Sequence, residues 1–370
     1  MTLEEVRQKI DEIDSRLLPL FQARMDCARE VAAIKKEAGL PVLNPEREQA
    51  ILDRVAQRAG EYGGAARVLY STLMEVSRGL QHSLLDDGGG FRALVEGAKL
   101  PPAPSGSIAT FGRPGSFSHQ AACSLFPGCS PVFFPSFAEI FAAVASGQAQ
   151  FGVLPVENSS AGSVGEVYDL ILKYRFFIVG AETLGVRHCL AAPEGAAPLE
   201  RVYSHPQALA QCSQRIAQLG LSPVTCSSTA EAAFTAAREK GAAAVCSEEA
   251  AAAAGLAVLE RNIQNTENNC TRFILISREL YIPRDANKIS LCFSLPHTTG
   301  SLHGVLSRFA QAGLNLTKIE SRPIPGRKFE YDFYLDFTGS VKDSQTIALL
   351  SSLYVELPRF SFLGNYTERE

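Results

Sequence analysis

Two breaks in the hydrophobic pattern divide this chain of 370 residues into three blocks. Residues 1–85 show helical periodicity, residues 107–282 alternate short β-rich runs with helical runs, and residues 287–366 repeat that alternation on a smaller scale. The breaks are a glycine- and proline-rich stretch at 86–106 and a shorter joint at 281–285. We therefore predict a multidomain protein with an all-α domain at 1–88, a linker at 89–105, an α/β domain at 106–282 and an α+β domain at 287–370.

The composition is that of an ordinary globular protein. The 35 Lys and Arg residues are balanced by 39 Asp and Glu residues, which excludes the basic excess typical of nucleic-acid-binding proteins. The longest apolar runs fall short of the roughly 18 residues that indicate a membrane span, and the N-terminus is acidic rather than leader-like. The nine cysteines lack zinc-ligand spacing. We expect a cytoplasmic protein without a metal, a nucleic-acid partner or a membrane partner.

Cations interrupt the apolar stripe of the first predicted helix. Apolar residues recur at spacings of three and four from Leu3 to Ile34, the pattern of a long packed helix. Arg24 occupies one position of this stripe, and Arg7 and Lys35 each lie one residue beyond another. A charge on an apolar face is costly unless it is paired, so three cations here favour an anion site over side chains that merely reach solvent.

Helix geometry limits which of these cations can share a ligand. Arg24 and Lys35 lie on one face, about 16 Å apart along the axis, so their side chains can converge on a small dianion. Arg7 lies about 25 Å from Arg24 and could contribute only from an antiparallel partner helix, which predicts a dimer. Pro19 predicts a kink in this helix.

Two further helices complete the first block. One opens at Asn44-Pro45, with Asn as the N-cap, and the other covers about 65–85 and places Ser77 and Gln81 on one face. With Val6-Arg7-Gln8-Lys9-Ile10-Asp11 and Glu75-Val76-Ser77, this block resembles the chorismate mutase domain that opens bacterial bifunctional P-proteins.

The resemblance implies specific roles in a Claisen rearrangement, which needs no nucleophile or proton transfer, only a dianion held in its reactive conformer. Arg7, Arg24 and Arg47 would hold the carboxylates of chorismate. Lys35 and Gln81 would bond its ether oxygen, and Glu48 and Ser77 would complete the pocket together with Asn44, which stands where some relatives carry aspartate.

The middle block reads as two lobes built on mainly parallel α/β sheets, with motifs at the strand ends where such folds place ligands. The predicted strands are 107–111, 151–156, 176–181, 186–191, 201–204, 224–226, 243–246 and 272–277. The motifs at their ends are Gly112–Gln120 with Ser116, Pro155–Ser159 with Glu157 and Asn158, Ser204–Gln207, and Asn268–Phe273 with Thr271 and Arg272.

Each motif alone is ambiguous, since Thr271 could simply favour the strand and His119 or His205 could cap a helix. Taken together and in this order, they resemble the prephenate dehydratase domain. The resemblance implies that Thr271 is the residue most tied to dehydration. Glu157, Asn158 and Gln207 would be polar groups of the active site, with Arg272 and Ser116 binding substrate. Thr271 and Glu157 both remain candidates for the proton donor.

The third block predicts the order strand, helix, strand, strand, helix, strand of a ferredoxin-like fold. It resembles the ACT domain of the same enzymes, in which two motifs bind phenylalanine at a dimer interface. The corresponding residues here are Gly300, Ser301 and Leu302 in the first motif, and Glu320, Ser321, Arg322 and Pro323 in the second. A bare dimerisation module is the alternative.

These resemblances predict a homo-oligomeric bifunctional enzyme that converts chorismate to prephenate and prephenate to phenylpyruvate, CO2 and water. Neither step requires a cofactor, and L-phenylalanine would be the feedback inhibitor. One rival is a sensor that binds an aromatic acid without turnover, although it would have no use for the cationic cluster of Arg24, Lys35 and Arg47. Closer rivals are an enzyme with one inactive site and a dehydratase that prefers arogenate.

Overall fold

The computed structural model describes residues 2–85, 88–102, 107–196, 198–266, 268–298, 300–324, 326–327 and 329–369. The chain forms two compact units, one of Met1–Gly97 with Ile289–Phe362 and the other of Ala98–Lys288 with Leu363–Glu370. Both units combine segments that are distant in sequence. Within the described residues, no helix is long and apolar enough to cross a membrane.

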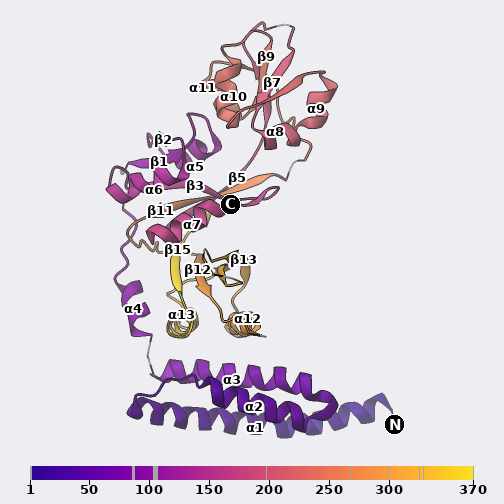
Figure 1. Cartoon of the computed structure of the whole chain (residues 1–370), viewed down its shortest axis with the longest axis vertical. Helices are drawn as coiled ribbons and strands as arrows, with labels where there is room; N and C mark the ends of the chain where they lie inside the picture. Colours follow the sequence, from indigo (N-terminus) through magenta and orange to yellow (C-terminus); the bar gives the residue numbers. More distant parts are fainter. Residues whose placement is uncertain are drawn as a thin grey trace. The chain divides into compact units, whose positions relative to one another are not determined.

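The first unit begins with long helices (Figure 1). Helix α1 covers Leu3–Ala38 and starts in a capping box, in which the Thr2 side chain accepts from the Glu5 amide and the Glu5 carboxylate accepts from the Thr2 amide. The helix ends at Gly39, whose φ of 62° suits glycine. Helix α2 covers Pro45–Arg58 and α3 covers Gly63–Leu85. Asn44 caps α2, as predicted.

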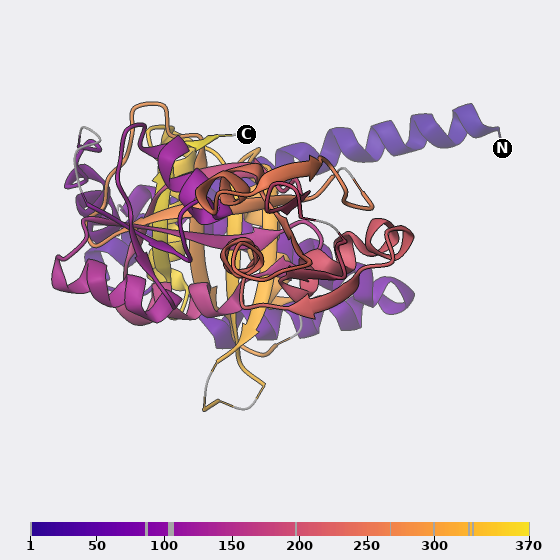
Figure 2. The ribbon, with the colours of Figure 1, turned by 90° about the horizontal axis from the view of Figure 1, so that it is seen from above.

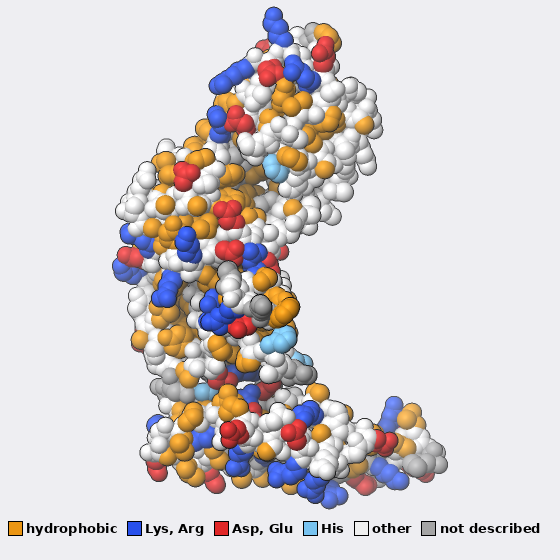
Figure 3. Space-filling model, viewed as in Figure 1, with side chains coloured by type: hydrophobic (Ala, Val, Ile, Leu, Met, Phe, Trp, Pro, Cys, Tyr) orange, Lys and Arg blue, Asp and Glu red, His pale blue; other side chains and the backbone are white. Residues whose placement is uncertain are grey.

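Helix α1 continues through Pro19 as a single helical element, and Figure 2 shows its N-terminal part as a regular helix. A kink at Pro19 stays a prediction. Most of its apolar stripe is also exposed, since Leu3, Ile10, Ile13 and Leu17 have exposed fractions of 68%, 51%, 59% and 54%. In Figure 3, hydrophobic side chains lie among charged ones over this helical region. The stripe is therefore not buried within a single chain.

The predicted linker contains a helix. Helix α4 covers Gly89–Glu96, and Phe91 is fully buried with its ring packed 5.2 Å from that of Phe362 and 6.0 Å from that of Tyr354. The glycines that suggested a flexible linker precede an aromatic anchor that fixes the segment. Residues 86–87 and 103–106, also assigned to this break, lie outside the described residues.

The first unit also contains most of the third block, in the order β12, α12, β13, β14, α13 and β15. Its sheet, which we call the C-terminal sheet, has the strand order β13-β14-β12-β15. The elements are β12 at Lys288–Ser294, α12 at Ser301–Gln311, β13 at Leu316–Pro323, β14 at Tyr331–Thr338, α13 at Ser344–Glu356 and β15 at Ser361–Tyr366.

The second unit consists of two lobes (Figure 1). The sheet of the first lobe has the order β16-β5-β11-β3-β1-β2, with β4 paired to β3. Its strands are β1 at Ile108–Phe111, β2 at Val132–Phe134, β3 at Phe151–Asn158, β4 at Gly162–Ser163, β5 at Phe177–Gly185, β11 at Cys270–Ser277 and β16 at Glu368–Arg369. Its helices are α5 at Phe117–Leu125, α6 at Phe137–Ser146 and α7 at Gly165–Tyr174.

The sheet of the second lobe has the order β10-β6-β9-β7-β8, and its core is rich in alanine. Its strands are β6 at Cys189–Ala192, β7 at Arg201–Ser204, β8 at Ser222–Thr225, β9 at Ala242–Cys246 and β10 at Ala257–Glu260. Its helices are α8 at Pro206–Gln211, α9 at Ser213–Gln218, α10 at Thr229–Ala236 and α11 at Glu248–Ala253.

Both sheets are mixed, which corrects the prediction of mainly parallel sheets. Strand β11 inserts between β3 and β5 and is antiparallel to both, and β6 is antiparallel to β9 and β10. The parallel pairs β1·β3, β1·β2, β7·β9 and β7·β8 follow helical crossovers, as expected. The return of β11 to the first lobe brings two distant motifs together on neighbouring strands.

Candidate functional site

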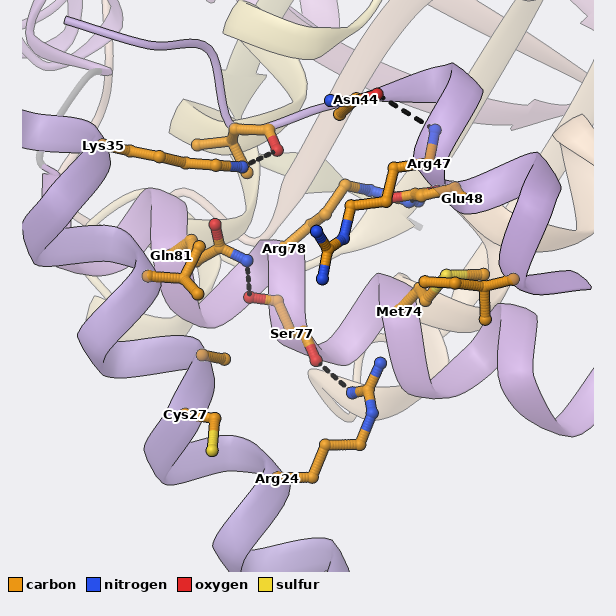
Figure 4. A pocket seen from close by; sticks show the side chains of 14 residues that line it. Arg24, Cys27, Lys35, Asn44, Arg47, Glu48, Met74, Ser77, Arg78 and Gln81 are labelled. Atoms are coloured by element: carbon orange, nitrogen blue, oxygen red, sulfur yellow. Dashed lines mark hydrogen bonds and ion pairs between the residues drawn. The ribbon is translucent and has the colours of Figure 1, made fainter. Parts of the chain in front are cut away.

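The helical region encloses a pocket of about 230 Å³ between α1, α2 and α3 (Figure 4). It contains seven of the eight residues that the sequence predicted for this site. The predicted residues that line it are Arg24, Lys35, Asn44, Arg47, Glu48, Ser77 and Gln81, together with Cys27, Ala28, Val31, Val42, Ile51, Met74 and Arg78. Three helices thus converge on one space.

Positive charge dominates this pocket. Its described lining contains the four cations Arg24, Lys35, Arg47 and Arg78 against one carboxylate, that of Glu48. Arg78 pairs with Glu48, which leaves the other three cations without a carboxylate in the lining. Figure 4 shows the guanidinium of Arg47 pointing into the space between the helices. The charge suits a small dianion.

Uncharged acceptors hold the α1 cations. Arg24 donates to the carbonyl oxygen of Leu73, at 2.9 Å, and to the hydroxyl of Ser77, while the Lys35 amine donates to the carbonyl oxygen of Val42. Burial lowers the pKa of Arg24, and Tyr70 and Glu48 oppose that shift; burial also lowers the pKa of Lys35. An entering anion would relieve this cost of partly buried positive charge.

Arg7 does not line the pocket. Its side chain is 63% exposed and lies 3.7 Å from Glu4 on its own helix. The position agrees with the helix geometry, in which Arg7 is too far along α1 from Arg24 to share a ligand within one chain.

The second unit contains a cleft of about 460 Å³ between its two lobes. The predicted residues Ser116, Asn158, Gln207 and Thr271 all line it. Its wall also includes apolar side chains such as Phe111, Phe117, Phe137 and Phe273. Among the described residues, neither Lys nor Arg lines this cleft.

Asn158 is the centre of a hydrogen-bond network in the cleft. Its Nδ2 donates to the Thr271 hydroxyl at 2.8 Å and to the Asn269 side chain at 2.9 Å. Its Oδ1 accepts from Nε2 of Gln207, at 3.1 Å, and from the backbone amides of Ser160 and Ala161 at 3.0 Å. Because the Thr271 oxygen accepts from Asn158, its own proton can be donated to a group in the cleft.

Glu157 and Arg272 do not line this cleft, so the structure does not place them where prediction put them. The two residues are paired across β3 and β11, next to the Asn158 and Thr271 pair, and therefore face the other side of the sheet. Arg272 instead pairs with Glu368 and bonds the Tyr366 hydroxyl at 2.7 Å. Thr271 consequently remains as the candidate proton donor of the original pair.

A β-bulge explains which residue of β3 faces the cleft. The register shifts between Arg272↔Glu157 and Phe273↔Pro155, so β3 carries one extra residue at this point. Regular alternation would put Pro155 and Asn158 on opposite faces, yet both line the cleft. Bulges often redirect side chains beside active sites, as this one redirects Asn158.

Sequence reasoning missed several polar residues of these sites. Asn269 donates to Oε1 of Gln211 at 3.0 Å, and Nε2 of His188 lies 3.1 Å from the same oxygen. Gln211 follows Gln207 by four residues on α8, a spacing that could have identified it. His188 lies inside a predicted strand, and Arg78 lies beside a predicted residue, so neither carried a distinctive signal.

The first unit contains another pocket, of about 310 Å³, at the start of α12. It is lined by Leu295, Pro296, His297, Thr298, Ser301, Phe329, Tyr331 and Phe333. Of the predicted effector residues, Ser301 lines this pocket, and Gly300 precedes it as the helix N-cap with a φ of 86°. Leu302 follows in α12, whereas Glu320, Ser321, Arg322 and Pro323 lie on the edge strand β13 outside the lining.

Comparisons with known proteins agree with the division into a helical region and a two-lobed α/β region. Family models match at residues 6–82 (Chorismate mutase type II) and residues 108–280 (Prephenate dehydratase). A bifunctional chorismate mutase/prephenate dehydratase of Aquifex aeolicus (strain VF5) is 32% identical over 98% of this chain and 97% of its own length. Arogenate dehydratase 3 of Arabidopsis thaliana is 40% identical over 72% of this chain and 69% of its own.

A crystal structure of prephenate dehydratase from Arthrobacter aurescens, in complex with L-Phe, is also similar. It matches with a TM-score of 0.65 and 29% identity, over 70% of this chain and 90% of that one. The chain therefore belongs to the family of bifunctional chorismate mutase/prephenate dehydratases. The predicted family is confirmed, and with it the prediction of an enzyme that carries both activities.

Proposed function

We propose that the helical pocket converts chorismate to prephenate and that the two-lobed cleft converts prephenate to phenylpyruvate, CO2 and water, under feedback inhibition by L-phenylalanine. The observation that carries this proposal is that most of the predicted residues line two separate cavities, one rich in Lys and Arg and the other without either among its described lining residues. We assign the mutase to 1–88, the dehydratase to 106–282 and the regulatory domain to 287–370, with 89–105 as the connection.

In the mutase pocket, Arg24 and Arg47 bind the two carboxylates of chorismate. Lys35 and Gln81 face the ether oxygen, on which negative charge develops as the C–O bond breaks. Glu48, Ser77 and Asn44 orient these groups. Asn44 supports the site through the backbone of Arg47, whose amide bonds its Oδ1 at 3.0 Å. Catalysis consists of holding the reactive conformer and stabilising this charge.

A second copy of the chain completes this pocket. The stripe of α1 exposes several large apolar side chains, among them Leu3, Ile10, Ile13 and Leu17, and Arg7 lies near the opposite end of this stripe from Lys35. Burying that stripe against an antiparallel copy would bring the partner's Arg7 towards this pocket and remove several large apolar side chains from water. A homodimer is therefore the smallest active form that we propose for the mutase.

In the dehydratase cleft, Thr271 donates its proton to the departing hydroxyl of prephenate, which leaves as water while the ring loses its carboxylate as CO2, and the Thr271 oxygen takes a proton back from solvent. Asn158 orients Thr271, and Gln207 fixes the amide of Asn158. The substrate carboxylates face the starts of α5 and α10, which are capped by Ser116 and Ser228 at the cleft wall. Helix starts carry partial positive charge and can replace the cation that Arg272 was expected to supply.

The order of elements in the third block and the order of its sheet support a ferredoxin-like ACT domain. We propose that L-phenylalanine binds near Gly300, Ser301 and Leu302, where an aromatic-lined pocket opens at the start of α12. Glu320, Ser321, Arg322 and Pro323 lie on an edge strand, from which they can reach an effector bound between two copies. The similarity to a dehydratase crystallised with L-Phe supports this effector.

Assays of the purified chain with chorismate and with prephenate, each with and without phenylalanine, test the proposal. We expect phenylpyruvate from both substrates and less of it with phenylalanine. Turnover of prephenate alone would contradict the mutase assignment, and an unchanged rate with phenylalanine would contradict the effector. Because relatives include both prephenate and arogenate dehydratases, the assay should compare the two substrates at equal concentration, and faster turnover of arogenate would revise the substrate.

A further inference from the structure

The C-terminal residues of the chain are part of the dehydratase sheet. Strand β16, formed by Glu368 and Arg369, pairs in parallel with β5, opposite Ala181 and Glu182. The amide of Ala181 donates to the carbonyl of Thr367 at 3.1 Å, and the amide of Glu368 donates to Asn287 at 2.9 Å. We call residues 366–369 the C-terminal strap.

The approach of the strap to β5 depends on a glycine. Gly364 has a φ of 151°, and a Cβ at this position would lie 2.0 Å from the carbonyl oxygen of Ile178. Only glycine permits this close passage of one backbone over another. Close backbone packing therefore holds the strap in place, in addition to the contacts of its side chains.

Glu368 inserts between two cations on the face of the sheet opposite the cleft. Its carboxylate pairs with the Arg272 guanidinium and, at 2.7 Å, with the Lys288 amine, and the three side chains are only 10–12% exposed. Tyr366, fully buried, accepts from Arg272 at 2.7 Å through its hydroxyl. Because a buried charge without its partner is costly, this group holds Arg272 in one position.

The position of Arg272 is coupled to that of Thr271, because the two residues are consecutive on β11 and their side chains point to opposite faces. On one edge of β11, the bulge in β3 interrupts the ladder directly after this pair. On the other edge, β5 pairs with β11 in unbroken register from Cys270 to Leu275. The strap adds an attachment through the Arg272 side chain, on the face opposite the cleft, which the backbone ladders do not supply.

We propose that Glu368 and Tyr366 are positioning residues for dehydration, which act by fixing Arg272 and thereby the hydroxyl of Thr271 beside Asn158. The proposal rests on the role assigned to Thr271 above. It explains why a residue next to the proton donor is bound to the C-terminal end of the chain instead of to substrate. Loss of this attachment leaves the binding groups of the cleft in place and displaces the reacting hydroxyl.

The first test compares four variants of the full-length chain: Glu368→Gln, Glu368→Asp, Tyr366→Phe and, as a matched control, Arg369→Ala. Arg369 is the neighbouring strap residue, and its guanidinium contacts the Ser124 carbonyl at 3.4 Å. We expect Glu368→Gln to lower dehydratase kcat by about tenfold to a hundredfold, as small displacements of reacting groups do, with KM changed less than about twofold. Glu368→Asp should recover part of the rate, and Arg369→Ala should leave it unchanged.

The mutase activity of the same preparations reports on folding, since its pocket is formed by other helices. If Glu368→Gln does not fold, Tyr366→Phe, which removes the hydroxyl that accepts from Arg272, carries the test with a smaller expected loss. A normal kcat in both variants, with only a lower thermal midpoint, would show that the strap stabilises the fold without positioning Thr271.

A double-mutant cycle separates this proposal from the role of Thr271 itself. We expect Thr271→Ala alone to reduce dehydratase kcat strongly, and Glu368→Gln to cause little further loss in the Thr271→Ala background. If Thr271→Ala retains activity, the proposed role of Thr271 fails. If Thr271→Ala is strongly impaired but Glu368→Gln lowers its residual rate by the same factor as in the wild type, the strap acts by another route and the positioning proposal is overturned.

Discussion

The mutase pocket and the dehydratase cleft take related dianions by different means. The pocket presents Arg24, Lys35 and Arg47, whereas the described lining of the cleft contains amides, hydroxyls and helix starts but no lysine or arginine. The difference follows from the chemistry. A rearrangement needs charge placed around a folded substrate, while dehydration also needs a hydroxyl aimed at a leaving group.

The two sites also differ in how completely one chain builds them. In the cleft, Asn158, Thr271 and Gln207 come from different strands and helices of one unit, and Asn158 is hydrogen-bonded to both of the others. In the pocket, Arg7 is absent and the apolar stripe of α1 remains exposed. One chain thus brings together the residues that we propose for the dehydratase, whereas we infer that the mutase needs a second copy.

Removing a pocket cation should have the largest effect. We expect Arg24→Ala to lower mutase kcat/KM by about a thousandfold, because a partly buried charge–carboxylate contact contributes several kcal/mol, and to leave dehydration of added prephenate unchanged. Steady-state assays with chorismate and with prephenate measure both. Arg29→Ala, on an exposed position of the same helix, is the matched control. A parallel loss of both activities would show that the two sites are not independent.

Removing the central amide of the cleft should give the converse result. We expect Asn158→Ala to lower dehydratase kcat by about a hundredfold, because Thr271 loses the donor that orients its hydroxyl, while mutase activity stays normal. Ser159→Ala, which removes the neighbouring hydroxyl and its bonds to the Cys270 amide and the Asn268 carbonyl, measures the effect of disturbing the turn alone. An unchanged kcat with a raised KM would mean that Asn158 binds substrate and does not orient Thr271.

Charging the α1 stripe tests whether only the mutase depends on a second copy. We expect Ile13→Lys to weaken dimerisation and to lower mutase activity at least tenfold at low protein concentration, because a charge opposes burial of that face, with dehydration retained. Ser15→Lys adds the same charge on the other side of the helix as a control. Sedimentation gives the mass, and a monomer with full mutase activity would exclude a contribution from the partner copy.

Sequence reasoning identified most members of both sites because cations on an apolar stripe and polar motifs at strand ends are local patterns. The stripe with Arg24 and Lys35, the cap at Asn44 and the order of the dehydratase motifs could all be read without a structure. Seven of the eight residues expected for the mutase line one pocket. The eighth, Arg7, was expected from a partner helix, and the structure does not place it in this pocket.

The errors concern choices that depend on tertiary structure. Which of Glu157 and Asn158 faces the cleft is decided by a one-residue bulge, and the partner of Arg272 lies 96 residues further along the chain, at Glu368. Likewise, the buried ring of Phe91 anchors a helix in the glycine-rich stretch because it packs on Phe362. None of these contacts leaves a local pattern in the sequence.

The smallest predicted effect concerns His188, which anchors the outer part of the cleft network. Its side chain is 2% exposed, Nε2 lies 3.1 Å from Gln211, and within the described residues Nδ1 has no hydrogen-bond partner. Burial lowers the pKa of His188, and the bond to Gln211 only partly opposes that shift. The folded protein therefore keeps this histidine neutral under conditions in which the unfolded chain protonates it.

The difference in the pKa of His188 between the folded and unfolded states determines whether the free energy of unfolding rises or falls with pH. Below the unfolded-state pKa of about 6.5, the unfolded chain binds more protons, so stability should fall as the pH drops through this value. We expect His188→Gln to reduce the loss of unfolding free energy at low pH by about 1 kcal/mol, which corresponds to about 2–4 °C in the thermal midpoint. Part of the pH dependence should remain in this variant, because burial also lowers the pKa of His119. Calorimetry between pH 5 and pH 8 measures the slope. The mutase pocket contains no histidine among its described lining residues. If His188→Gln changed the pH dependence of stability of the helical region by the same amount, the assignment of this pH effect to the cleft would be contradicted.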